Sequence, residues 1–260
     1  MTGPTIFVYR DAGLLASAAA ARLVTALADA RARTGRASVV LTGGGIGTRV
    51  LAAVAAEPAR DAVEWPAVDI WWGDERFQPA GDPERNETGA RAALLDHVAV
   101  RPDRVRAMPG PDGPDGDDPA AAAARYAGWL REAAGPAEPA GVPAFDVLML
   151  GIGPEAHVAS LFPGAPAVAE SRRTVVAVPD SPKPPPVRLS LTLPAIRAAR
   201  QVWILASGAE KAAAVALALS GASPDQAPAA GARGMQRTLF LLDADAAGQL
   251  PAAQRSPAAR

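Results

Sequence analysis

Short runs of apolar residues alternate with longer alanine-rich stretches along most of the chain. The apolar runs have the length and continuity of strands buried on both faces, and they cover residues 5–9, 37–42, 68–72, 145–151, 174–178, 189–193, 201–206 and 239–243. The alanine-rich stretches predict helices at about residues 11–33, 49–56, 86–95, 120–134, 195–199 and 207–219. This alternation predicts a mainly parallel, doubly wound sheet in a three-layer α/β/α fold.

The chain shows no internal repeat and no linker long enough to separate two domains. A chain of 260 residues can bury a full core in one domain. Residues 109–119 are rich in proline, glycine and aspartate, which predicts a loop inside that domain. We therefore predict a single α/β domain over residues 1–245 and a flexible C-terminal tail over residues 246–260.

Charge and composition restrict the partners of the chain. The formal net charge of −1 at pH 7 argues against nucleic acid as the main partner. No apolar run reaches about 18 residues and no N-terminal targeting pattern is visible, so we expect no membrane partner and a cytoplasmic location. There is no cysteine, which excludes thiolate chemistry. Only two of the 26 basic residues are lysines, Lys183 and Lys211. Either these positions need a compact ammonium, which arginine cannot supply, or the distribution is due to chance.

A glycine-rich turn, Gly43-Gly44-Gly45, lies between the predicted strand at 37–42 and the helix that follows. Glycine lets backbone N–H groups approach an anion, and the helix N-terminus adds partial positive charge. Thr48 could add a hydroxyl. The alternative is a tight turn that needs glycine for a positive φ. The spacing fits neither a dinucleotide nor a nucleoside triphosphate motif.

Charged residues follow several other strands. Asp74-Glu75-Arg76 comes directly after the run at 68–72, and Arg76 could hold a carboxylate or phosphate through two hydrogen bonds. The alternative is a solvated turn. Lys183 and Arg188 flank a stiff proline run that suits anion capture, and Lys211 stands in the first turn of a predicted helix.

His157 follows the apolar run at 145–151 by a few residues, at the edge of a parallel sheet where ligands bind. A histidine there can act as a general base near neutral pH, or it can cap a helix end as a structural residue. We assign no chemistry to His97, which lies in a predicted helix. No second histidine or carboxylate cluster accompanies His157 at ligand spacing, so we expect no metal site.

Taken together, these segments resemble the 6-phosphogluconolactonases of the glucosamine-6-phosphate isomerase/6-phosphogluconolactonase family. The family's motifs are matched, in order, by Thr42-Gly43-Gly44, Asp74-Glu75-Arg76, Asn86, Gly151 to Pro163, Pro182 to Arg188 and Gly208 to Lys211. Three features depart from the usual pattern. Glu155 replaces Asp, Ala156 replaces Gly, and Gly45-Ile46-Gly47 replaces a Ser-Thr-Pro type of continuation.

The resemblance implies hydrolysis of 6-phospho-D-glucono-1,5-lactone to 6-phosphogluconate, the second step of the pentose phosphate pathway. It also implies the glucosamine-6-phosphate deaminase fold and no cofactor. We expect a small sugar-phosphate lactone as the partner and a monomeric chain. The catalytic residues would be His157 as general base together with Arg76 and Asp74. The substrate and its phosphate would be bound by Gly43, Gly44, Gly45, Thr48, Asn86, Arg188 and Lys211.

Two other functions remain open at this point. The first is an isomerase or deaminase acting on an amino-sugar phosphate, which would share the fold and the phosphate loop. Such deaminases carry Phe-Asn-Glu-Pro where this chain has Ser160-Leu161-Phe162-Pro163, and Asp-Glu-Tyr where it has Arg76. The second is a sugar-phosphate-binding protein without catalytic activity. An assay that follows lactone loss and ammonia release would separate these functions.

Overall fold

The computed structural model describes residues 3–136, 138 and 140–255. Its centre is a six-stranded sheet in the order β1-β9-β8-β5-β2-β3, and every neighbouring pair is parallel. The strands are β1 Thr5–Tyr9, β2 Ala37–Leu41, β3 Val68–Trp72, β5 Val147–Gly151, β8 Gln201–Ala206 and β9 Arg237–Asp243. The predicted parallel, doubly wound α/β fold is confirmed.

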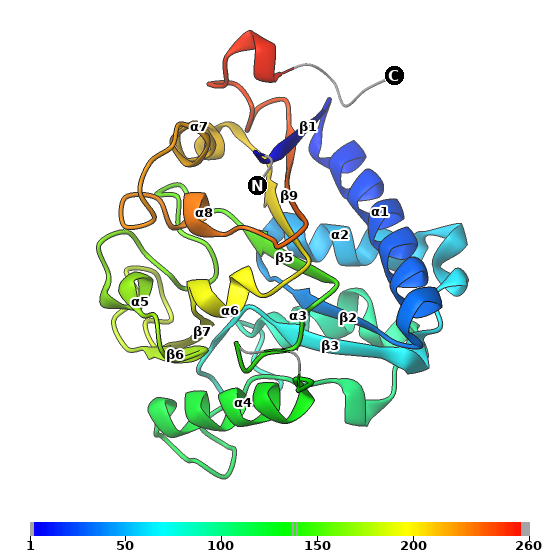
Figure 1. Cartoon of the computed structure of the whole chain (residues 1–260), viewed down its shortest axis with the longest axis vertical. Coiled ribbons are helices and arrows are strands. Elements are labelled where there is room, and N and C mark those ends of the chain that lie inside the picture. Colours follow the sequence, from blue (N-terminus) through cyan, green and yellow to red (C-terminus); the bar gives the residue numbers. More distant parts are fainter. Residues whose placement is uncertain (1–2, 137, 139, 256–260) are drawn as a thin grey trace.

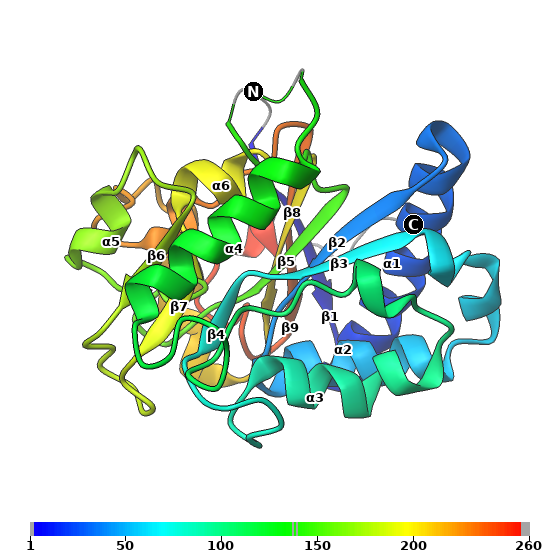
Figure 2. The same cartoon turned by 90° about the horizontal axis from the view of Figure 1, so that it is seen from below.

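Helices cover both faces of this sheet. They are α1 Ala12–Thr34, α2 Gly44–Ala56, α3 Asn86–Ala93, α4 Pro119–Ala133, α5 Pro166–Ala169, α6 Leu193–Arg197, α7 Ala212–Leu219 and α8 Pro228–Gly231. Figures 1 and 2 show α1 and α2 on one side of the sheet, and α4 and α6 on the other.

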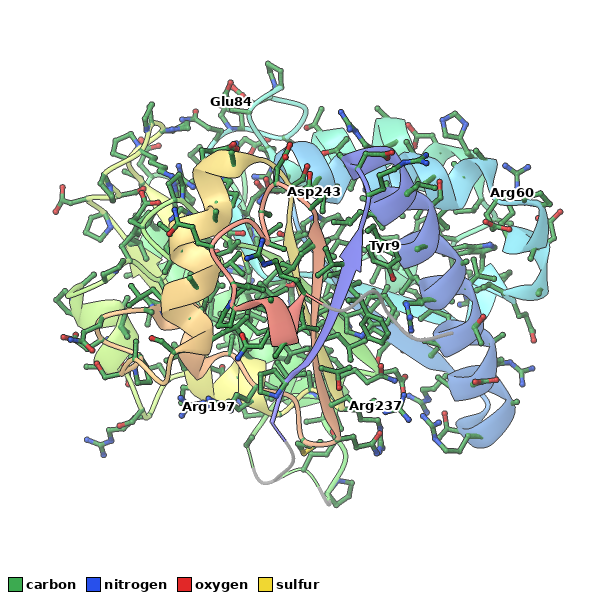
Figure 3. The ribbon with its side chains drawn as sticks, turned by 90° about the horizontal axis from the view of Figure 1, so that it is seen from above. Tyr9, Arg60, Glu84, Arg197, Arg237 and Asp243 are labelled. Atoms are coloured by element: carbon green, nitrogen blue, oxygen red, sulfur yellow. The ribbon has the colours of Figure 1, made fainter. Side chains whose placement is uncertain are left out.

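Because all six strands are parallel, the sheet has one edge where strands begin and one where they end. We call these the amino edge and the carboxyl edge. Figure 3 shows both on β9, which runs from Arg237 at the amino edge to Asp243 at the carboxyl edge.

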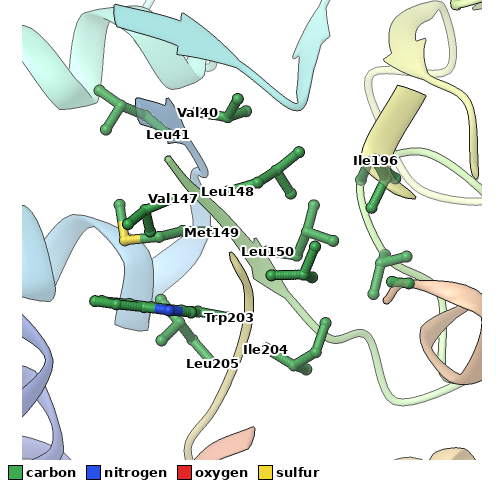
Figure 4. Packing of buried hydrophobic residues seen from close by; sticks show 14 of the residues in the cluster. Val40, Leu41, Val147, Leu148, Met149, Leu150, Ile196, Trp203, Ile204 and Leu205 are labelled. Atoms are coloured by element: carbon green, nitrogen blue, oxygen red, sulfur yellow. The ribbon is translucent and has the colours of Figure 1, made fainter. Parts of the chain in front are cut away.

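The two central strands, β5 and β8, are buried on both faces. Residues 147–150 of β5 have no exposed surface, and Trp203 of β8 is 1% exposed. Figure 4 shows these side chains packed against apolar residues of β2 and α6. Burial on both faces explains why these strands are continuous apolar runs without polar alternation.

A second sheet was not predicted from the sequence. It has three antiparallel strands in the order β4-β7-β6, with β4 Asp74–Arg76, β6 Val175–Val178 and β7 Arg188–Leu191. Gly73 joins the two sheets: its N–H donates to Leu41 O in the large sheet, and its carbonyl accepts from Leu191 N in the small one. A charged strand of three residues has too few positions for a hydrophobic period, so the sequence indicated only a turn at Asp74.

Several predicted boundaries differ from the structure. Helix α2 begins at Gly44. The sequence predicted a later start, near Arg49, because glycine is a poor helix former. Helix α3 ends at Ala93, and His97 lies in a separate short 3₁₀ turn.

The predicted end of the domain at residue 245 has to be corrected. Ala246, Ala247 and Leu250 are at most 2% exposed, and Ala246 N donates to the Asp243 carboxylate. The packed chain therefore continues at least to Leu250. The remainder of the predicted tail includes residues 256–260, which lie outside the described part.

Helix α1 is long and apolar enough, by length and composition alone, to cross a membrane. The sequence prediction, which considered only uninterrupted apolar runs, did not single it out. In the fold, Leu15, Leu23 and Leu27 are among its buried residues, and the helix packs against α2, β2 and β9. Its apolar composition is therefore explained by its place in the core.

Candidate active site

A cavity of about 250 Å³ opens at the carboxyl edge of the large sheet. It is lined by Thr42, Gly43, Gly44, Asp74, Arg76, Asn86, Gly151, Ile152, Gly153, His157, Ala159, Lys183, Pro184, Arg188 and Lys211. A second cavity, of about 330 Å³, adjoins it and shares Gly43, Gly44 and Lys211. Residues predicted from six separate segments of the sequence thus meet in one place, and both lysines of the chain are among them.

The glycine turn forms the N-terminus of α2. Gly43 is the N-cap, and Gly44 has a φ of 79°, so the expected positive φ is present at one of the glycines. A Cβ on Gly43 would stand 1.8 Å from Oδ1 of Asn86, so this position also has no room for a side chain. The N-terminal residues of α2 thus line the cavity, and the N–H groups at a helix N-terminus suit an anion.

Two predicted binding residues lie outside the first cavity. Gly45 lines the adjoining cavity, together with Arg49 and Glu210. Thr48 lines neither: its side chain is exposed on α2, and its hydroxyl lies 3.9 Å from where a Cβ on Gly89 would stand. The side chain is turned toward α3 instead.

Asp74 is a buried carboxylate with fixed partners. Ser160 Oγ donates to its Oδ2 at 2.8 Å, and Asn86 Nδ2 donates to its backbone oxygen at 2.8 Å. Asn86 Nδ2 also donates to Oδ1 of Asp74, at 3.4 Å, and a carboxylate oxygen can accept a further hydrogen bond. Ser160 was quoted in the sequence motif but not selected as a site residue, because a serine in an apolar motif gives no sign of a distant partner.

His157 sits in a tight turn after β5. Its ring packs against Phe162 with centroids 4.4 Å apart, and a Cβ on Gly153 would stand 2.0 Å from Nδ1 of the ring. Nδ1 lies 3.1 Å from Oε2 of Glu155, although the two are not aligned for a good hydrogen bond. His157 lines the cavity, and its side chain keeps 13% of its surface exposed.

Burial lowers the pKa of His157 below its usual value of 6.5, and the Glu155 carboxylate raises it only in part. The imidazole is therefore neutral at pH 7, as a general base must be. Burial pushes the pKa of Glu155 up, but backbone N–H groups, Lys183 and His157 outweigh it and hold that pKa below the usual range. Lys183 Nζ is 3.1 Å from the Glu155 carboxylate, so the longer side chain of Glu155 links the histidine turn to the proline loop.

The departure at Ala156 has a visible cost. Ala156 has a φ of 65° and Ala159 a φ of 49°, in the left-handed region that favours glycine. A non-glycine residue there costs roughly 1–2 kcal/mol. The turn keeps its shape because Ala156 N donates to Gly153 O and Ala156 O accepts from Ala229 N.

The two arginines of the cavity have different surroundings. Arg188 is 4% exposed and donates to the backbone oxygens of Lys183, Pro184 and Pro185, so it mainly holds the proline loop closed. Burial lowers the pKa of Arg188. Arg76 donates through Nη1 to Glu84 O, whereas its buried Nε has no partner among the described residues.

Lys211 lies at the start of α7, after a short 3₁₀ turn over Ala209–Lys211. Burial and then the charge of Lys183 lower the pKa of Lys211. The preceding turn is held by Asp243, which accepts from Ser207 Oγ at 2.6 Å and from Gly208 N at 3.1 Å. Sequence analysis did not single out Asp243, because a lone aspartate after a strand carries no specific motif.

A group of three or more histidine, cysteine or carboxylate side chains that could hold a metal ion is absent from the residues the structure describes. What those residues bring together is a neutral histidine, a fixed aspartate, two arginines, two lysines and a helix N-terminus. Such a site can bind an anionic ligand and move a proton beside it.

Comparisons with known proteins agree with this arrangement. A family model described as glucosamine-6-phosphate isomerases/6-phosphogluconolactonase matches residues 10–241. A 6-phosphogluconolactonase of Streptomyces coelicolor is 61% identical over 255 residues, which cover 98% of each chain. The solved structure of 6-phosphogluconolactonase from Trypanosoma brucei superposes with a TM-score of 0.80 at 30% identity, covering 96% of this chain and 100% of that one.

A monomeric glucosamine-6-phosphate deaminase has a TM-score of 0.75 at 20% identity, covering 94% of this chain and 99% of its own, and so shares the fold. The predicted likeness to the deaminase fold is confirmed. With matched motifs, a common fold and a family model that spans most of its length, the chain belongs to the family of glucosamine-6-phosphate isomerases and 6-phosphogluconolactonases.

Proposed function

We propose that this chain hydrolyses 6-phospho-D-glucono-1,5-lactone to 6-phospho-D-gluconate, a step of the pentose phosphate pathway. The main support is His157, a partly buried imidazole with a lowered pKa that lines a cavity rich in cationic groups. The 61% identity to a protein named 6-phosphogluconolactonase over 98% of both chains supports the same reaction.

In the proposed reaction His157 activates water. Water attacks the lactone carbonyl carbon while Nε2 takes a proton from it. The carbonyl oxygen becomes an oxyanion, and the guanidinium of Arg76, which lines the cavity, stabilises it. The bond from the former carbonyl carbon to the ring oxygen then breaks, and the imidazolium returns its proton to that oxygen. The product is an open-chain carboxylic acid, which ionises at neutral pH.

The other predicted residues bind and orient the substrate in this proposal. The phosphate lies at the N-terminus of α2, where the Gly44 and Gly45 N–H groups and the Lys211 ammonium meet. Asp74, which lines the cavity and has capacity for a further donor, accepts a hydrogen bond from a sugar hydroxyl. Asn86 and Arg188 keep this arrangement in place through their contacts to Asp74 and the proline loop. We assign Thr48 no contact with the substrate.

The proposal involves no metal and no cofactor, because a neutral imidazole suffices to activate water for attack on a lactone. It also assumes that a single chain supplies the whole site, as expected for a monomer.

The test is direct measurement of lactone hydrolysis by NMR or pH-stat, against the spontaneous rate in buffer. Hydrolysis well above that background, unchanged after exhaustive chelation and without ammonia release from glucosamine 6-phosphate, is the expected result. Ammonia release would indicate a deaminase, and binding of 6-phosphogluconate without turnover would indicate a binding protein. Loss of hydrolysis on chelation, with recovery on adding a divalent ion, would contradict the metal-free mechanism.

A further inference from the structure

Glu75 stands between two residues of the cavity but does not line it. Side chains alternate along a strand, so Asp74 and Arg76 of β4 face the cavity while Glu75 points to the other side. Its side chain is 1% exposed. A carboxylate is almost never buried so completely without partners, so the groups around it should reveal what it does.

Three backbone N–H groups donate to this carboxylate. The distances are 2.9 Å from Arg76 N, 2.7 Å from Asn86 N and 2.8 Å from Glu87 N. Asn86 and Glu87 are the first two residues of α3, whose N-cap, Arg85, offers no side-chain cap of its own. Glu75 therefore replaces the missing cap from a neighbouring strand, with an anion at the positive end of the helix.

A buried arginine stands behind the carboxylate. Arg85 Nε is 3.9 Å from Oε2 of Glu75, and its other nitrogens are held by Gln78 O and Met108 O. Burial raises the pKa of Glu75 to about 7, while Arg85 and the backbone N–H groups act in the opposite direction. Since all these neighbours are donors, the ionised carboxylate is the form that fits the site.

The position of Asn86 depends on this link. From the first turn of α3, its Nδ2 holds the backbone oxygen of Asp74, and its Oδ1 occupies the space beside Gly43. A shift of α3 would therefore move the aspartate and the glycine turn at the same time. The backbone N–H of Arg76, a residue that lines the cavity, donates to the same Glu75 carboxylate.

We propose that Glu75 is a positioning residue for lactone hydrolysis: it sets the mutual placement of Asn86, Asp74 and Arg76 without touching the substrate. This role rests on the proposed lactonase function. A purely structural role would change stability alone. The positioning role predicts instead that Glu75 affects kcat/KM and that this effect depends on Asn86.

The test is a double-mutant cycle on Glu75→Gln and Asn86→Ala, measured well below the melting temperature. Glutamine keeps the shape but turns an NH₂ group toward backbone donors. We expect Glu75→Gln alone to lower kcat/KM by about 10–100-fold, as small misplacements at active sites do. In the Asn86→Ala background the same change should cost less than about threefold, because the route through Asn86 is already lost.

Asp146→Asn is the matched control. Asp146 also accepts from a backbone N–H and pairs with arginines, but it lies at the amino edge. We expect it to lower the melting temperature and leave kcat/KM within about twofold. If Glu75→Gln costs the same factor with and without Asn86, or changes only the melting temperature as Asp146→Asn does, the proposal is wrong.

Should Glu75→Gln fail to fold, Glu75→Asp replaces it in the same cycle. Aspartate keeps the charge on a side chain one methylene shorter, and the same non-additivity is expected. Wild-type hydrolysis above the spontaneous rate tests the proposed function by itself. The ratios between variants test Glu75, so the two failures can be told apart.

Discussion

The two edges of the large sheet use similar residues in different ways. At the amino edge, Asp146 accepts from Ser38 N and Oγ and pairs with Arg33 at 2.8 Å, which ties β5 to β2 and α1. At the carboxyl edge, Glu75 and Asp243 are even more deeply buried, and they accept from the N–H groups of helix starts and turns. Figure 3 shows the separation of the two edges on β9.

The difference lies in what the carboxylates hold. At the amino edge a carboxylate connects neighbouring strands and so contributes to stability. At the carboxyl edge the carboxylates hold helix starts and turns around the cavity. Nε of Arg76 is buried there without a partner among the described residues, and Ala156, in a neighbouring turn, has a φ of 65°. Groups left open or strained in this way cost stability and are typical of functional sites.

The largest effect on activity is expected for His157→Asn, which tests the functional role of the carboxyl edge. Asparagine keeps a polar side chain at the carboxyl edge but removes the base, so kcat should fall by about 10²–10⁴-fold with little change in melting temperature. NMR or pH-stat assays of lactone hydrolysis, corrected for the spontaneous rate, measure kcat. Near-native kcat in a folded variant would show that His157 is not the base, and Glu155 would be the next candidate.

A smaller effect is expected for Lys211→Ala. Removal of a charge-assisted hydrogen bond to the phosphate should cost roughly 1.5–3 kcal/mol, mainly as a higher KM. The matched control is Arg237→Ala, an exposed cation at the amino edge, which should leave KM unchanged. An unchanged KM with a collapsed kcat in Lys211→Ala would place the ammonium at the reacting carbonyl instead.

Asp146→Asn tests the amino edge from the side of stability. Loss of the charge shared with Arg33 and Arg200 should lower the free energy of unfolding by about 1–2 kcal/mol. Urea unfolding at pH 7 measures this, together with kcat/KM of the folded variant. Unchanged stability, or a fall in activity, would remove the functional contrast between the edges.

The titration of His157 sharpens the comparison further. Since burial lowers its pKa, the NMR midpoint should lie below 6.5, and the His157→Asn spectrum assigns the signal in a chain with two histidines. The folded state then binds this proton less tightly than the unfolded chain, so this group costs stability as pH falls below about 6.5. In Glu155→Gln the midpoint should drop further. A midpoint at or above 6.5 would contradict the assignment of a buried neutral base.

The smallest expected effect is that of Ala156→Gly. Glycine relieves the penalty of a positive φ but adds freedom to the unfolded chain, which leaves a net stabilisation below about 1 kcal/mol. Ala21→Gly, on the exposed side of α1, should instead destabilise by about 1 kcal/mol. If both changes destabilise equally, the turn at Ala156 is not strained.

Most of the large sheet could be predicted from the sequence, because strands such as residues 147–150 are buried on both faces and therefore read as unbroken apolar runs. The small sheet could not, since Asp74–Arg76 forms a strand only through pairing with β7, far away in sequence. The same reason applies to the site. His157 and Lys211 stand in local motifs, whereas Ser160 and Asp243 act through partners that only the fold brings near.

Gly43 and Gly153 show how the site restricts which amino acids can occupy a position. Neither needs glycine for a left-handed backbone; the space of their missing Cβ atoms is filled by Asn86 and by the ring of His157. Every other amino acid brings a Cβ, so any amino-acid substitution at these two positions disturbs the site. A library selected only for folded protein would tolerate other residues there, whereas one selected for turnover would return glycine alone.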